Sequence, residues 1–114
     1  MSSYDPQEYV EAVLGLVESI PPGRVMSYGA VADALHDRFG RGSARRVGTI
    51  MAQWGGGVPW HRVVNGAGRL PPGHEQRARA LLESEGVVFR GPRVRMADYA
   101  WQPGPPTPGD APYG

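Results

Sequence analysis

The chain has 114 residues, a length that suits one domain with a modest hydrophobic core. It carries 12 basic and 11 acidic side chains and no cysteine, which excludes disulfides, thiolate metal sites and any thiol nucleophile. No apolar run is long enough to cross a bilayer and no basic-apolar leader begins the chain. We therefore expect no membrane association and a cytoplasmic location.

The charges are unevenly distributed along the chain. Residues 38–74 hold six arginines and no acid, whereas residues 1–37 hold six acids against Arg24 alone. A run of one charge is usually only a solvated face. Six cations without an opposing anion nevertheless favour phosphate as a ligand, because neighbouring acids would cancel the field. Nucleic acid is the leading partner class.

The first predicted helix begins at Asp5-Pro6, where Asp5 can cap and Pro6 suits the first turn. Its apolar residues recur at helical spacing and predict a helix to about Ser19. The apolar stripe consists of Val10, Val13, Leu14 and Val17.

Two shorter helices are predicted next, capped by Ser27 and Ser43 and separated by a loop containing Gly40 and Gly42. We expect Val31, Ala34 and Leu35 of the second helix to face inward, and Val47, Ile50 and Met51 of the third to share one face. Such a pair after a longer helix resembles a helix-turn-helix unit.

The outward face of the third helix combines one long cation with small residues. Arg45 points almost opposite Val47, among Gly48, Thr49 and Ala52. A helical glycine costs about 1 kcal/mol relative to alanine. This face suggests a helix that lies closely in a groove of a duplex while Arg45 inserts. The alternative is an ordinary surface arginine, with Gly48 easing the packing of helices.

Short strands and turns dominate the second half of the chain. Val63-Val64 is predicted to turn through residues 65–68 into Arg69-Leu70 as a small hairpin. A fourth helix, ending at Gly86, follows with Ala78, Leu81 and Leu82 inward, and a wing-like pair of strands is expected at 87–89 and 94–96. The fold class is therefore mostly α with a small β hairpin, a winged-helix-like helix-turn-helix domain. We expect this domain to span residues 1–102, with a disordered Pro/Gly-rich tail at 103–114.

The stretch Val58-Pro59-Trp60-His61-Arg62-Val63-Val64 is the most informative motif. Pro59 and the preceding triple glycine present Trp60 from a loop, although a tryptophan beside a proline is often only a packing residue. The motif resembles the Pro-Cys-His-Arg-Val active site of the O6-alkylguanine-DNA alkyltransferases, with Trp60 in place of the alkyl-accepting cysteine. That replacement is typical of the alkyltransferase-like proteins, and the resemblance extends over about residues 6–103.

The resemblance implies a site that binds DNA in the minor groove and holds a nucleotide rotated out of the duplex. Tyr28 matches the family residue that helps to rotate the nucleotide, and Arg45 matches the arginine that fills the vacated space. The implied DNA-binding residues are Tyr28, Ser43, Ala44, Arg45 and Gly48. The implied lesion pocket consists of Tyr28, Met51, Val58, Pro59, Trp60 and Val63.

His61 belongs to a Cys-His-Glu relay in the alkyltransferases. By alignment the glutamate of the relay falls near Arg79, so we expect the relay to be dismantled and Arg62 to form a structural bridge. An indole is no nucleophile at neutral pH. We therefore expect no catalytic residue, no metal and no cofactor.

The function implied is that of a non-enzymatic sensor for O6-alkylguanine in double-stranded DNA. It would act as a monomer in the cytoplasm or nucleoid and mark lesions for nucleotide excision repair proteins. One alternative is a sequence-specific helix-turn-helix regulator, which would favour Asn or Gln on the third helix. Another is a base-lesion enzyme, a glycosylase or residual alkyltransferase, which needs a thiol or a carboxylate near the pocket.

Overall fold

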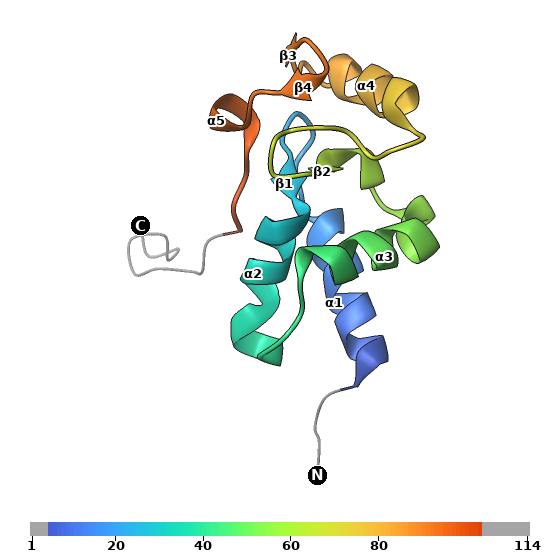
Figure 1. The fold of residues 1–114 in the computed structure, drawn as a ribbon, viewed down its shortest axis with the longest axis vertical. Coiled ribbons are helices and arrows are strands. Elements are labelled where there is room, and N and C mark those ends of the chain that lie inside the picture. The colour runs from blue at the N-terminus through green and yellow to red at the C-terminus, as the bar shows by residue number, and fades with distance from the viewer. Residues whose placement is uncertain (1–4, 104–114) are drawn as a thin grey trace, which may run out of the picture.

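The computed structural model describes residues 5–103, so the predicted tail lies, apart from Pro103, outside the described residues (Figure 1). The prediction of a mostly helical fold with small sheets is confirmed. The elements are α1 Pro6–Glu18, β1 Met26–Ser27, α2 Tyr28–Phe39, α3 Ala44–Trp54, η1 Gly55–Gly57, η2 Trp60–Arg62, β2 Val63–Val64, α4 Glu75–Ser84, β3 Phe89–Arg90, β4 Arg93–Val94 and α5 Met96–Tyr99.

Each of the first three helices begins at the predicted cap. Asp5 accepts a hydrogen bond from the amide of Gln7 (2.9 Å), and the hydroxyls of Ser27 and Ser43 accept from amides three residues further on (3.0 and 3.2 Å). The caps satisfy amides that a helix start leaves unpaired. The inward faces are as expected, with one correction. In α2 it is Ala32 that is buried, whereas Ala34 is exposed.

The short strand at 63–64 does not form the predicted hairpin. β2 pairs in parallel with β1, with Met26 opposite Val63 and Ser27 opposite Val64. The predicted turn at residues 65–68 does form, and the amide of Gly68 donates a hydrogen bond to the carbonyl of Asn65 across it (2.9 Å). The prediction failed because a two-residue strand takes its partner from tertiary packing, which leaves no local pattern in the sequence.

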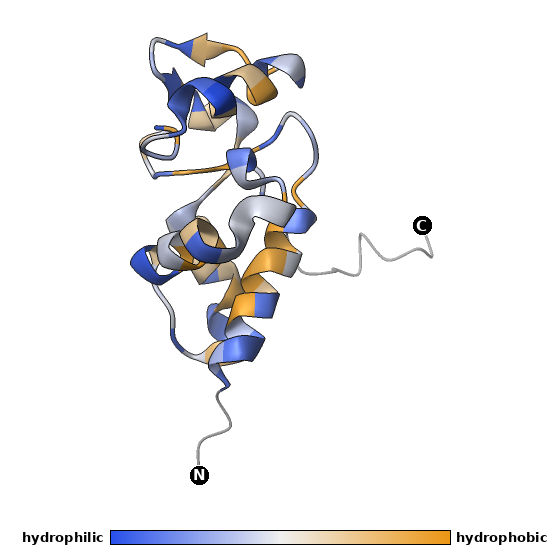
Figure 2. Cartoon of the chain, turned by 90° about the vertical axis from the view of Figure 1, so that its right-hand side faces the viewer, coloured by the Kyte–Doolittle hydropathy of each residue, from blue (hydrophilic) through white to orange (hydrophobic). Residues whose placement is uncertain are grey.

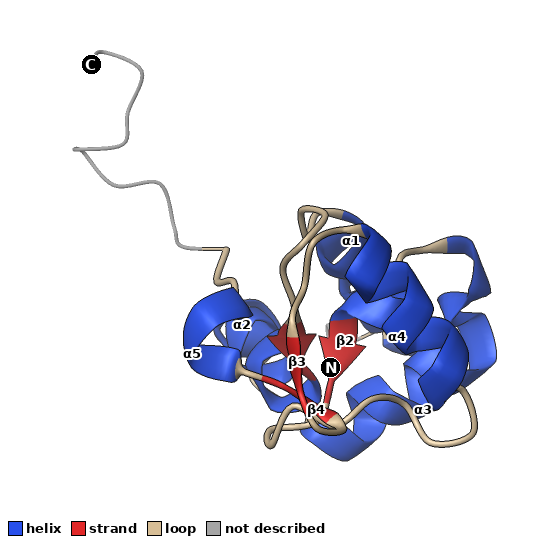
Figure 3. Ribbon diagram, turned by 90° about the horizontal axis from the view of Figure 1, so that it is seen from above, coloured by secondary structure: helices blue, strands red, loops and turns tan. Residues whose placement is uncertain are grey.

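These two strands divide the core into two clusters. Met26 and Val63 face the cluster formed by α1, α2 and α3, whereas Val25 and Val64 face a second cluster with Leu82 of α4. The alternation follows from the two-residue period of extended chain. Seen from above, α4 and α5 lie on opposite sides of the short strands (Figure 3).

The predicted wing is an antiparallel hairpin of β3 and β4. Its strands are displaced from the predicted positions, since Val87 precedes the ladder and Met96 begins α5. Hydrophilic and hydrophobic residues occur side by side on the helices (Figure 2). Within residues 5–103, no helix combines the length and the apolar character that crossing a membrane requires.

Candidate nucleic-acid interface

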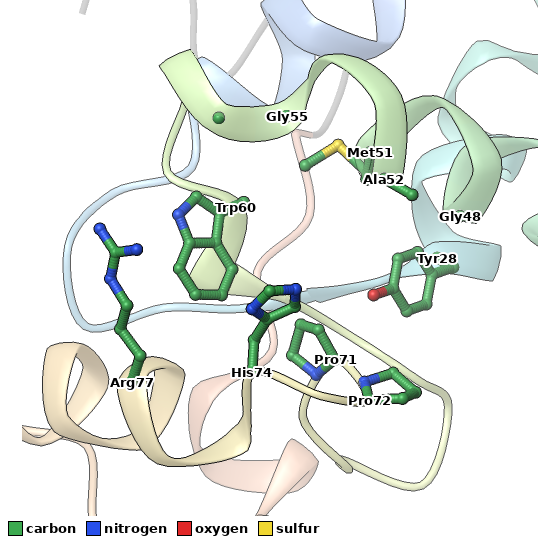
Figure 4. Close-up of a pocket in the computed structure, with 11 residues that line it drawn as sticks. Tyr28, Gly48, Met51, Ala52, Gly55, Trp60, Pro71, Pro72, His74 and Arg77 are labelled. Carbon is green, nitrogen blue, oxygen red and sulfur yellow. The ribbon is translucent and has the colours of Figure 1, made fainter.

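A cavity of about 540 Å³ lies between α3, η2 and the segment that leads into α4 (Figure 4). This volume lies within the range of about 300–1,000 Å³ that is typical of small-ligand sites. Its walls come from both halves of the chain, so the cavity occupies the junction of the two cores. The lining residues are Tyr28, Gly48, Met51, Ala52, Gly55, Gly56, Trp60, Pro71, Pro72, His74 and Arg77.

Trp60 forms one wall of this cavity and is half-buried. Pro59, at φ −72°, precedes the short η2 helix that holds the indole in place. The ring meets His74 edge-on, with 5.7 Å between ring centroids, and the guanidinium of Arg77 lies 5.6 Å from the indole centroid. The indole is therefore fixed by its neighbours while it still presents surface to the cavity.

The wall opposite is built by α3 and the start of α2. Met51 points into the cavity from α3, and Tyr28 closes the side away from Trp60 (Figure 4). Burial raises the pKa of the Tyr28 hydroxyl. The hydroxyl therefore stays protonated and can donate a hydrogen bond to an anionic oxygen.

Three of the six residues expected in the lesion pocket line the cavity, namely Tyr28, Met51 and Trp60. The other three do not. Val63 is completely buried opposite Met26, and Val58 packs on the first core. Pro59 holds the chain behind the indole without lining the space. Adjacency in the motif misled here, because neighbours along an extended or 3-10 segment face different sides.

The sequence did not reveal the wall formed by Pro71, Pro72, His74 and Arg77. A signal was available in Pro71-Pro72, since two rigid residues shortly after the 65–68 turn hold the chain in a fixed path. What the sequence does not show is that this short path brings α4 up to Trp60.

The residues expected to touch DNA lie at the start of α3. Ser43, Ala44 and Arg45 are exposed, and the Ser43 hydroxyl is engaged in capping the helix. Gly48 opens onto the cavity, and a Cβ added there would meet no atom within 4 Å. The packing of helices therefore does not require glycine at this position, which removes the alternative explanation for it.

The prediction that the Cys-His-Glu relay is dismantled is wrong for the histidine–carboxylate pair. Nε2 of His61 donates to Glu85 at 2.8 Å, so the acidic partner is Glu85 and not a residue near Arg79. Arg62 donates to the same carboxylate at 2.7 Å and to the carbonyl of Ile20 at 2.9 Å, which confirms its bridging role. The relay keeps its histidine and its carboxylate and lacks only the thiol.

The cavity wall carries the guanidinium of Arg77 and no carboxylate, since no lining residue is Asp or Glu. The imidazole of His74 also lines it. Within residues 5–103 no group of three His, Asp or Glu side chains is placed to hold a metal ion. The arrangement suits a flat, electron-rich ligand that stacks on the indole.

Sequence comparisons with known proteins identify a family and several relatives. The family model described as "6-O-methylguanine DNA methyltransferase, DNA binding domain" matches residues 8–87. The DNA base-flipping protein of Escherichia coli (strain K12) is 35% identical over 98 residues, which cover 82% of this chain and 74% of that protein. Alkyltransferase-like protein 1 of Schizosaccharomyces pombe is 33% identical over 108 residues, covering 84% and 96%.

Solved structures agree with the sequence matches. The structure of S. pombe Atl1 in complex with damaged DNA containing O6-carboxymethylguanine superposes with a TM-score of 0.74 at 31% identity. The superposition covers 88% of this chain and all of that one. A second structure, of S. pombe ATL in complex with DNA, gives a TM-score of 0.72 at 30% identity.

Proposed function

Because this chain belongs to the alkyltransferase-like branch of the 6-O-methylguanine DNA methyltransferase family, we propose that it binds O6-alkylguanine in DNA without removing the alkyl group. The observation that carries the proposal is the cavity beside Trp60. Trp60 takes the place of the acceptor cysteine in the motif, and its indole lines the cavity together with residues of α3, the helix that bears Arg45. We place the everted purine between the indole and Met51.

The chemistry of the wall explains binding without transfer. Alkyl transfer needs a thiolate, and the motif position holds an indole in a sequence without cysteine. Stacking on an aromatic ring contributes about 1–3 kcal/mol per base and tolerates different substituents. His61 and Glu85 remain as a structural pair, since no thiol is present for them to activate.

Eversion of the nucleotide is assigned to two residues, Tyr28 in the cavity wall and Arg45 at the start of α3. The Tyr28 hydroxyl donates a hydrogen bond to the phosphate of the rotated nucleotide, and Arg45 fills the gap left in the stack. Ser43, Ala44 and Gly48 allow the sugar-phosphate walls to approach α3. An alkylated guanine pairs poorly, so it costs less to unstack than a normal base.

A protein that binds and does not repair needs a downstream partner. We propose that it acts as a monomer on cytoplasmic, nucleoid-associated DNA and that nucleotide excision repair proteins respond to the complex. The supporting argument is chemical, because a tightly held lesion that is not repaired persists until another activity removes it.

The decisive experiment is a titration of two duplexes that differ only in one O6-methylguanine, at several stated salt concentrations. We expect at least tenfold tighter binding of the damaged duplex, whatever its flanking sequence. Equal affinity for both duplexes, or selection of one undamaged sequence, contradicts the proposal. A radiolabelled methyl group should stay on the DNA, and transfer to protein or release of a base contradicts the non-enzymatic assignment.

Variants of two residues separate their roles in that titration. Trp60→Ala should reduce affinity for the damaged duplex about tenfold and leave plain duplex nearly unchanged, because only stacking is lost. Arg45→Ala should also weaken binding of the damaged duplex, since the gap stays open. Trp54→Ala is the matched control, because Trp54 is 49% exposed and lies outside the cavity. Equal losses for Trp60→Ala on both duplexes would make Trp60 merely structural.

A further inference from the structure

Backbone pairing aligns three arginines at the β3–β4 hairpin, which is the predicted wing. Arg90 is the direct partner of Arg93 in the β3–β4 hairpin, and Arg93 is in turn bridged to Arg69. Residues directly opposite in antiparallel pairs project from the same face, with Cβ atoms about 4.5–5.5 Å apart. Arg69, Arg90 and Arg93 therefore form one row, which we call the arginine row.

The arginine row faces outward. Val94, the next residue of β4, is buried in the second core and is paired with the half-buried Phe89. Side chains alternate along a strand, so the Arg90–Arg93 pair projects from the opposite face. All three arginines are exposed.

No carboxylate neutralises this row within residues 5–103. Arginines nearby are paired, with Arg79 bound to Glu83 at 3.0 Å and Arg95 to Asp98 at 3.2 Å. The guanidinium groups of the arginine row have no such partner in the described part of the chain. Like charges directly opposite one another destabilise a sheet. The row is therefore unfavourable for the free protein and favourable only when an anion lies against it.

The position of the row relative to the cavity identifies that anion. Arg69 lies two residues before Pro71, which lines the cavity together with Pro72. In Figure 1 the segment between β2 and α4 runs between α3 and the hairpin. Arg69, the first member of the row, is thus two residues along the chain from the cavity wall, and its bridge to Arg93 continues the row onto the hairpin. A strand whose nucleotide enters the cavity carries its neighbouring phosphates past the rim of the cavity.

We propose that the arginine row is a second DNA-binding site that holds backbone phosphates beside the everted nucleotide. It acts in addition to α3 and reads no base. This inference rests on the proposed DNA binding and is independent of lesion recognition.

Salt dependence measures the phosphate contacts directly. Each neutralised phosphate of B-DNA contributes about 0.9 to the slope of log affinity against log salt. The double variant Arg90→Gln/Arg93→Gln should reduce the magnitude of this negative slope by nearly 2. Addition of Arg69→Gln should reduce the magnitude further. The loss should be the same on damaged and undamaged duplex. Arg90→Lys/Arg93→Lys keeps both charges and should keep the slope.

The matched control removes two charges that are bound within the protein. Arg24 donates to the carbonyl of Asp98 at 3.3 Å and Arg95 pairs with its carboxylate. Arg24→Gln/Arg95→Gln should therefore change the slope by much less than the row variant. An unchanged slope in the row variant, or an equal change in the control, overturns the proposal.

Melting curves complete the test. Because removal of facing cations relieves repulsion, the row variant should melt at the same temperature as the wild type or higher. A lower melting temperature with lost binding overturns the claim that the row serves DNA rather than the fold. If the wild type shows no lesion preference while the magnitude of the slope still falls in the row variant, phosphate binding by the arginine row is supported and the proposed lesion recognition is contradicted. If the wild type binds no duplex, both proposals are contradicted.

Discussion

Glu85 joins three segments that are distant in the sequence. Its carboxylate accepts hydrogen bonds from the amide of Gly23 (2.9 Å), from Nε2 of His61 (2.8 Å) and from the guanidinium of Arg62 (2.7 Å). Partial burial alone would raise the pKa of Glu85. The hydrogen bonds from Arg62, His61 and Gly23, with the charge of His61, outweigh burial and lower it to about 2. The residue thus ties η2, which holds Trp60, to the end of α4.

We expect Glu85→Gln to lower the free energy of unfolding at pH 7 by about 2 kcal/mol, because hydrogen bonds to charged groups contribute about 1.5–3 kcal/mol. A folded-state pKa below the unfolded value stabilises the protein fully above the unfolded value of 4.5. This stabilisation is lost as the pH falls toward 2. Denaturant unfolding of wild type and variant should therefore differ at pH 6 and converge between pH about 4.5 and about 2.

The control for this prediction is Glu83→Gln. The Glu83 side chain is 50% exposed and pairs with Arg79 on the surface, so its loss should cost less than about 1 kcal/mol. A Glu85 variant that differs from wild type by the same amount at pH 6 and pH 2.5 would show that the carboxylate charge is not responsible.

The same residues show where sequence reasoning succeeds and fails. The motif and the helical period are local, so the sequence alone singled out Trp60 and Arg45, whose roles stay predictions. Glu85 was missed because it lies 24 residues from His61. The partner of a buried histidine is decided by the path of the chain, which local pattern does not contain.

At the scale of the element, α3 combines a packed inner face with an open outer one. Val47 and Ile50 are buried, whereas Arg45, Thr49 and Ala52 are exposed. The helical wheel predicted this division correctly because the period of an α-helix fixes it. The partners of the two-residue strands, in contrast, are set by the two cores that they separate.

Gly48 allows stability and binding to be separated within α3. Gly48→Gln should raise the free energy of unfolding by about 0.5 kcal/mol, since glycine is a poor helix residue and the added Cβ meets nothing within 4 Å. The same change should reduce duplex affinity at least tenfold, because the side chain stands where DNA approaches the helix. Urea unfolding and the duplex titration measure the two effects.

Gly15 supplies the matched control for that substitution. It is an exposed glycine within α1, and a Cβ there also meets nothing within 4 Å. Gly15→Gln should give the same gain in stability with unchanged binding. If Gly48→Gln binds DNA as well as Gly15→Gln does, α3 does not approach a duplex closely.

At the scale of the whole molecule, the site depends on how the two cores are joined. The first core supplies Tyr28 and Met51, the second half supplies Pro71 and His74, and Trp60 stands between them. The sequence predicted one domain and most of its helices. It did not predict the junction, because that arises from pairing of β1 with β2 across 35 residues of intervening chain.

The segment from Tyr99 to Trp101 fastens this junction. The amide of Val25 donates to the carbonyl of Tyr99 (3.0 Å), and the amide of Trp101 donates to the carbonyl of Val25 (2.8 Å). The half-buried Trp101 also packs on the first core. We propose that the folding unit ends close to residue 102, as the sequence predicts.

Two shortened chains test this boundary. A chain ending at Pro103 keeps every contact just described, so its urea-unfolding free energy and its preference for damaged duplex should equal those of the full chain. A chain ending at Ala100 loses the Trp101 ring and its hydrogen bond. It should lose about 2–3 kcal/mol, somewhat below the 3–5 kcal/mol of a fully buried tryptophan. Trp101→Ala in the full chain should reproduce most of that loss. A deficit already present in the chain ending at Pro103 would extend the folding unit beyond the predicted boundary.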